Sequence, residues 1–129
     1  MTKKDEEKSL LKRSTDFLET AEYQTSRGFY NLATFSLEQT LQLFLKAKVL
    51  AAGSDYPRIH SVRNLLRLLS SLVPKDKKSA IESILKNYFM ELGMLEDAYV
   101  TSRYVTREFT TEEVETLTKT VREIMKNVK

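Results

Sequence analysis

Hydrophobic residues recur at three- and four-residue intervals along most of the chain, which is the spacing of one face of an α-helix. Residues 5–27 carry such a stripe and predict a first helix that ends at Gly28, because glycine adopts the left-handed capping conformation without steric cost. Residues 29–52 predict a second helix, ended by Gly53, with a much wider apolar arc. Its polar positions form only a narrow strip: Asn31, Glu38, Gln42 and Lys46. This pattern is typical of a central bundle helix with neighbours on two sides.

The second half of the chain predicts three further helices. After a loop at residues 53–60, a stripe of valines and leucines over residues 62–73 predicts a third helix, which Pro74 ends. Residues 76–101 carry the most regular apolar stripe in the chain and predict one long fourth helix. A capping box formed by Thr110 and Glu113 opens the last helix, whose apolar face continues to residue 128.

These elements together predict the fold class. No segment keeps a period of two, apart from a short ambiguous stretch at residues 99–106, so we expect no β-sheet. We therefore expect an all-α protein: an up-and-down bundle of five helices, four long core helices and a shorter one, in a single domain over residues 1–129.

Composition excludes several classes of chemistry. The absence of cysteine excludes a disulfide scaffold, a thiolate zinc site, an iron–sulfur cluster and a cysteine nucleophile. One histidine and no Glu-x-x-His pair argue against a metal site, and the isolated glycines form no phosphate-binding loop. We expect no catalytic residue, no metal and no cofactor. The adjacent acids Glu96–Asp97 and Glu112–Glu113 are interpreted as surface charge and helix-start acids.

The ends and the apolar stretches of the chain bear on its location. The first eight residues are highly charged, where a signal peptide needs an apolar segment. The richest apolar region, residues 41–52, is interrupted by polar side chains and falls short of the about 20 residues that span a membrane. We expect a soluble, cytoplasmic protein with no membrane association.

The small basic excess is unevenly distributed. Within a formal net charge of +3, residues 54–86 hold seven basic and three acidic side chains. Two interpretations are open: an electropositive flank that attracts phosphate groups, or the solvated faces of ordinary helices. Arg63 and Arg67 lie four residues apart on the polar face of the predicted third helix, where they either meet an anion or face water.

Two places carry candidate ligand-binding side chains. His60 lies at the start of the third helix and either packs locally or contacts phosphate and transfers a proton, because histidine changes charge near neutral pH. Arg103 and Tyr104, with Tyr99 about one turn earlier, form the second place. An arginine beside an aromatic ring holds a phosphate and stacks a base, and the open alternative is an arginine that ties down the helix end.

Met90 and Met94 lie about half a turn from the apolar stripe of the predicted fourth helix. A second buried contact, such as a dimer partner, explains apolar side chains in that position. The alternative is two methionines tolerated on the surface.

The motifs as a set resemble a known family. Residues 28–35, followed by Gln39 and residues 45–47, resemble the first signature of HEPN domains (higher eukaryotes and prokaryotes nucleotide-binding). The resemblance continues through Gly53, His60 and the leucines after it, and through Tyr99 with Arg103–Tyr104, covering about residues 10–128 in the expected order. It implies an up-and-down helical bundle that commonly forms homodimers. It also implies frequent pairing with a separately encoded minimal nucleotidyltransferase in toxin–antitoxin-like modules of bacteria and archaea.

The sequence departs from the motif pattern of those HEPN family members that act as metal-independent ribonucleases. Those members carry an arginine, four to six residues and then a histidine, whereas Arg58 precedes His60 by only two positions. Neither Arg103 nor Arg107 is followed by a histidine. Val105 stands where relatives have proline, and Gln42 stands where relatives often have glutamate. Measured against the family pattern, the sequence therefore lacks the arginine–histidine pair that would carry out acid–base catalysis and stabilise the phosphate.

Three functional hypotheses follow. The leading one is a non-catalytic module that dimerises and binds a nucleotide, RNA or a minimal nucleotidyltransferase partner through the following residues: Arg103, Tyr104, Tyr99, His60 and Arg63. The second is a metal-independent ribonuclease toxin that uses His60 with Arg63 or Arg103. The third is a purely structural oligomerisation module with Met90 and Met94 at the contact.

Overall fold

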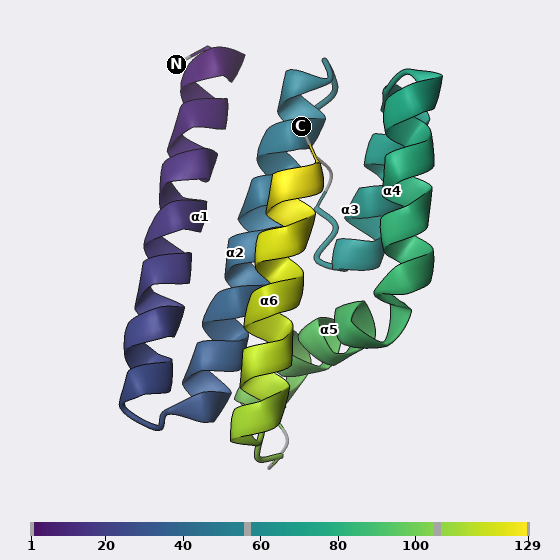
Figure 1. Cartoon of the computed structure of the whole chain (residues 1–129). Coiled ribbons are helices and arrows are strands. Elements are labelled where there is room, and N and C mark those ends of the chain that lie inside the picture. The colour runs from purple at the N-terminus through teal and green to yellow at the C-terminus, as the bar shows by residue number, and fades with distance from the viewer. Residues whose placement is uncertain (1, 56–57, 105–106, 129) are drawn as a thin grey trace.

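The structure, a computed structural model, describes residues 2–55, 58–104 and 107–128, and it describes their side chains except those of residues 101–104. Within these ranges the chain is helical and has no strand (Figure 1). The helices are α1 (Lys3–Ser26), α2 (Tyr30–Ala51), α3 (Val62–Leu72), α4 (Lys75–Asn87), α5 (Phe89–Tyr104) and α6 (Thr111–Asn127). The all-α class is confirmed. None of the described helices is both long enough and apolar enough to cross a lipid bilayer.

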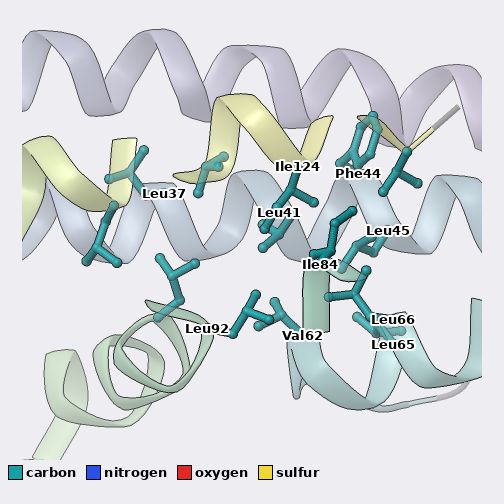
Figure 2. Packing of buried hydrophobic residues seen from close by; sticks show 14 of the residues in the cluster. Leu37, Leu41, Phe44, Leu45, Val62, Leu65, Leu66, Ile84, Leu92 and Ile124 are labelled. Atoms are coloured by element: carbon teal, nitrogen blue, oxygen red, sulfur yellow. The ribbon is translucent and has the colours of Figure 1, made fainter. Parts of the chain in front are cut away.

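Helix α2 is the centre of the bundle. It contacts α1, α3, α5 and α6, whereas α1 packs almost entirely along α2 (Figure 1). Leucines on successive turns of α2 belong to one core cluster that has members on every other described helix, and Figure 2 shows part of this packing. The labelled core residues are Leu37, Leu41, Phe44, Leu45, Val62, Leu65, Leu66, Ile84, Leu92 and Ile124. The wide apolar arc of the sequence is explained by these neighbours.

The two glycine stops are confirmed. Gly28 and Gly53 have φ angles of 76° and 92°, in the left-handed region that other residues enter only with strain. Pro74 ends α3 as expected and is the N-cap residue of α4.

The prediction of one long helix over residues 76–101 is wrong. The chain turns at Tyr88, which separates α4 from α5, and α5 then runs across the bundle from the lower end of α4 to behind α6 (Figure 1). No proline or glycine lies at the bend, so no local signal marks it. The bend serves packing: Ile84 of α4 faces the core beside α3, while Leu92 of α5 reaches α2 (Figure 2). The described part of the chain therefore forms six helices in place of the predicted five.

The capping box that opens α6 is confirmed. Glu113 N donates to Thr110 Oγ1 at 3.1 Å, and Thr110 N donates to Glu113 Oε1 at 2.9 Å. The backbone hydrogen bond from Thr110 keeps the pKa of Glu113 below its ordinary value, and Arg107, at 2.9 Å, acts in the same direction. The start of α6 is thus well defined.

Asn31 attaches the segment before α6 to the start of α2. Its Nδ2 donates to the carbonyl oxygen of Arg107 at 2.7 Å, and its Oδ1 accepts from the backbone N–H of Phe109 at 2.8 Å. The side-chain amide therefore pairs with two backbone groups 76 and 78 residues away. These bonds hold Phe109, which is 5% exposed, in the core cluster.

Replacing Asn31 with alanine is expected to lower the free energy of unfolding by about 1–2 kcal/mol, because two backbone groups lose their partner. Urea denaturation monitored by circular dichroism measures this change. Leu32→Ala is the matched control, since its side chain is 55% exposed and its loss changes little. Equal stability of the two variants would contradict the role given to Asn31.

Candidate ligand-binding site

A line of buried polar side chains runs along α2 beneath the surface of the bundle. Glu38, Gln42 and Lys46 lie at four-residue spacing and are 0%, 4% and 8% exposed. Gln42 Nε2 donates to Glu38 Oε2 at 2.8 Å, and Lys46 Nζ donates to Gln42 Oε1 at 3.0 Å. Gln39 Nε2 donates to the other carboxylate oxygen of Glu38 at 2.7 Å. The polar strip of α2 is therefore a hydrogen-bonded ladder inside the protein.

Burial changes the titration of both ends of this ladder. It raises the pKa of Glu38 from 4.5 to about 7, because an ionised carboxylate loses its hydration. The hydrogen bonds from Gln42 and Gln39 and the charge of Lys46 act against this rise without cancelling it. Burial likewise lowers the pKa of Lys46 from its ordinary value, opposed by the charge of Glu38.

His60 sits at the outer end of a second feature, a column of stacked rings. Its ring centroid lies 5.3 Å from that of Tyr99 at an interplanar angle of 20°, and Tyr99 stacks on Phe35 at 6.4 Å. His60 Nδ1 also lies 3.3 Å from Gln42 Oε1, which connects the ring column to the buried ladder. The side chain of His60 is exposed, so the column ends at the surface.

Glu96 of α5 binds the start of α3. Its carboxylate accepts from Ser61 Oγ at 2.7 Å and from Arg63 at three donors: the backbone N at 3.1 Å, Nε at 3.0 Å and Nη2 at 2.9 Å. Partial burial would raise the pKa of Glu96, but the hydrogen bonds from Arg63 and Ser61 outweigh it and keep that pKa below the ordinary value. The same contact raises the pKa of Arg63. The interpretation of Glu96 as surface charge is wrong.

These residues enclose a surface pocket of about 260 Å³. It is lined by His60, Ser61, Glu96, Tyr99 and Val100, so both the loop before α3 and the outer part of α5 contribute. The volume is below the about 300–1,000 Å³ of typical small-molecule pockets, which suits one planar group of a larger ligand. The two rings that line the pocket can stack on such a group, and the hydroxyl and the carboxylate of the ion pair can hydrogen-bond to it.

The sequence-predicted site residues are only partly brought together here. Tyr99 and His60 lie in contact and line the pocket, whereas Arg63 lies behind it, bonded to Glu96. The side chains of Arg103 and Tyr104 lie outside the described residues. Arg103 follows Tyr99 by four residues along α5, which is about one turn of helix.

The two methionines differ in their surroundings. Met90 is 77% exposed, next to Phe89 at 55%, whereas Met94 is half-buried and packs against the core cluster.

No site role was predicted for Glu38, Gln42, Ser61 or Glu96. Glu96 follows Leu92 by four residues, so helical periodicity places it beside the buried stripe of α5. Glu38 belongs to the narrow polar strip of α2, which the wide apolar arc flanks. A carboxylate in either position has to find hydrogen-bond donors, and that requirement was the available signal.

The rest of the described surface offers less binding chemistry than this pocket. A larger groove of about 420 Å³ lies between α1 and α6, where Glu22 and Arg122 form an ion pair at 2.6 Å, but no aromatic ring or histidine lines it. Over residues 2–55, 58–104 and 107–128, no three histidine, aspartate or glutamate side chains are grouped to hold a metal ion.

Comparison with known proteins gives one match. The family model described as HEPN domain matches residues 7–129, nearly the whole chain. No curated protein and no solved structure matches the chain.

Removing the buried carboxyl group is expected to change how stability depends on pH. Because the pKa of Glu38 is about 7 in the folded protein and near 4.5 when unfolded, the folded state binds this proton more tightly. Folding free energy is therefore lost as pH rises from about 4.5 to 7, by about 3 kcal/mol for this group. Glu38→Gln is expected to abolish this loss. Between about pH 5 and 8 the free energy of unfolding then falls more steeply with rising pH in the wild type than in the variant.

Urea unfolding at a series of pH values measures the slope. Glu108→Gln is the control, because Glu108 is exposed and its replacement leaves the slope unchanged. A wild-type stability that is flat or rises over this range would contradict the buried, proton-retaining state of Glu38.

Proposed function

The chain belongs to the HEPN domain family, and on that premise we propose that it is a nucleotide-binding helical module whose ligand enters the pocket between α5 and the start of α3. The observation that carries this proposal is the exposed imidazole of His60 stacked on Tyr99 at the pocket wall. Stacking against an aromatic side chain is the usual way in which proteins hold a single base.

Each pocket residue has a role in this proposal. The His60–Tyr99 pair stacks the base, and the hydroxyl of Ser61 lies beside it as a polar contact. Arg103 and Tyr104, about one turn beyond Tyr99 on α5, supply the phosphate contact, as an arginine beside an aromatic ring can do. Arg63 has a supporting role, because it donates to Glu96 through Nε and Nη2 and its charge is balanced there.

The arrangement favours binding over ribonuclease chemistry. Phosphoryl transfer without a metal needs a base and a cation positioned together on the phosphate. Arg63, which the ribonuclease hypothesis pairs with His60, donates to Glu96 instead. The ribonuclease toxin, with His60 and Arg103 as its pair, is the alternative that the binding experiment below also tests.

We also propose that the module forms a homodimer through the first turns of α5. Phe89 and Met90 are large apolar side chains that are 55% and 77% exposed, and Met94 lies on the same helix, half-buried. Exposed aromatic and methionine side chains are enriched at protein interfaces. A minimal nucleotidyltransferase, in a toxin–antitoxin-like pair within the cytoplasm, is the second proposed partner, and the family supports it.

Nucleotide binding is tested by calorimetric titration with AMP, ATP, GTP and a short RNA. We expect saturable binding of at least one of them, weakened about tenfold or more in Tyr99→Leu because the imidazole that meets the base loses the ring that holds it in place. Tyr23→Leu is the control, since Tyr23 is 60% exposed on α1 and does not line the pocket. Absence of saturable binding at millimolar ligand would sink the proposal, and RNA cleavage that His60→Ala abolishes would establish the ribonuclease alternative.

Dimer formation is tested by analytical ultracentrifugation over a range of protein concentrations. Met90→Glu is expected to weaken self-association by about tenfold or more, because it places a charge in an apolar contact. Leu32→Glu is the matched control, with 55% exposure at the start of α2. A monomeric wild type at high concentration, or equal association of both variants, would remove this interface.

A further inference from the structure

We infer that Gln42 is a positioning residue whose side-chain amide holds His60 in the Nδ1–H tautomer, so that Nε2 presents a hydrogen-bond acceptor to the ligand. The ligand part of this inference rests on the proposed function, whereas the tautomer does not. The inference rests on the contacts of Gln42, whose side-chain amide lies between two charged side chains and also reaches the imidazole of His60.

The first step is the orientation of the Gln42 amide. Lys46 on one side is a donor, so the Gln42 atom that faces it has to be the oxygen, at 3.0 Å. Glu38 on the other side is an acceptor when ionised, so the Gln42 atom that faces it has to be the nitrogen, at 2.8 Å. The opposite orientation would place two donors together at one end and two acceptors together at the other. The neighbours therefore determine which way the amide points.

The second step is the tautomer of His60. The atom of Gln42 that lies 3.3 Å from His60 Nδ1 is the same oxygen that accepts from Lys46. A carbonyl oxygen cannot donate, so Nδ1 has to carry the hydrogen that joins the two groups. In a neutral imidazole the other nitrogen, Nε2, then carries none and is an acceptor.

The third step is the direction in which Nε2 points. Nδ1 faces α2, and stacking on Tyr99 at 20° between the ring planes keeps the imidazole from turning over. Nε2 lies on the opposite edge of an exposed side chain that lines the pocket. Among the described residues no hydrogen bond to Nε2 is found.

The charges around this ladder keep the arrangement in place. Glu38 faces Lys46 on its own helix and Glu96 on α5, and Lys46 also faces Arg13 on α1. The charge of Glu96 is balanced by Arg63. Protonation of Glu38 removes only one of the two groups that orient Gln42, because Lys46 still requires the amide oxygen.

The ligand class follows from an acceptor at the pocket wall. A neutral Nε2 favours a group that donates a hydrogen bond, and a phosphate oxygen is an acceptor only. The structure therefore assigns to this position the exocyclic amino group of a base, as in adenine or cytosine, which approaches Nε2 at the exposed edge of the imidazole because the acceptor lone pair lies in the ring plane.

The tautomer is measured directly by nitrogen NMR. His60 is the only histidine in the chain, so a long-range proton–nitrogen spectrum of the labelled protein contains one imidazole and needs no assignment. At about pH 8.5, where histidine side chains are neutral, we expect a protonated Nδ1 and an unprotonated Nε2. Free histidine favours the opposite tautomer, so a wild-type spectrum dominated by Nε2–H overturns the inference.

Variants of the ladder separate positioning from general support of the fold. Gln42→Leu is expected to move the spectrum to the Nε2–H form, because the acceptor for Nδ1 is gone. Gln42→Glu keeps an oxygen there and is expected to retain the Nδ1–H form, which is the rescue that a merely structural role would not give. The double variant Glu38→Leu, Lys46→Met removes both groups that orient the amide and is expected to give a mixture. A folded Gln42→Leu protein with an unchanged spectrum overturns the inference, and the double variant decides if Gln42→Leu does not fold.

The ligand class is tested with AMP and with purine riboside 5′-monophosphate, which differ only in the exocyclic amino group. Wild-type protein is expected to bind AMP about threefold to tenfold more tightly, the effect of one hydrogen bond. The Gln42→Glu variant keeps this ratio, and the double variant Glu38→Leu, Lys46→Met reduces it. Equal binding of the two by wild-type protein overturns the ligand class. Binding of neither overturns the proposed function, while the NMR result still decides the role of Gln42.

Discussion

The side-chain amide of Gln42, held between a buried cation and a buried carboxyl group, is the interaction on which the candidate site depends. Its oxygen accepts from Lys46 and its nitrogen donates to Glu38, so three buried polar groups satisfy one another inside an otherwise apolar bundle. Burying polar groups costs several kcal/mol unless they find partners (about 2–7 for one amide or hydroxyl). The same network reaches the surface through His60, so a structural necessity of α2 also orients a pocket residue.

The pocket exists because α5 and the start of α3 are joined by Glu96. This carboxylate accepts from Ser61 and from three donors of Arg63, at the place where α5 has just turned away from α4. Without the bend at Tyr88, Tyr99 would lie far from His60 along a straight continuation of α4 (Figure 1). Fold and site are thus connected by one ion pair and one helix break.

Particular residues show how much of the fold and of the candidate site could be predicted from the sequence. The spacing of apolar residues, together with Gly28, Gly53 and the Thr110 capping box, gave the helix limits correctly, because these signals act within a few residues. The bend at Tyr88 has no such local signal, and it was missed. His60 and Tyr99 were selected from their residue types and their places along the chain, but their stacking across 39 positions of sequence was not foreseen. Arg63 was predicted to bind a ligand. Its actual partner, Glu96 on α5, is too distant in sequence for the pairing to be read from local spacing.

The amino-acid sequence by itself determined the helical class, most helix ends, the central position of α2 and the membership of the HEPN domain family. These properties follow from periodicity, capping and local motif, which are read along the chain. Only the tertiary structure decided that Glu38 and Lys46 are buried, that Glu96 binds Arg63 and that His60 meets Gln42. The reason is that such contacts join residues on different turns or helices, and packing in three dimensions selects which polar groups lose water and must find each other.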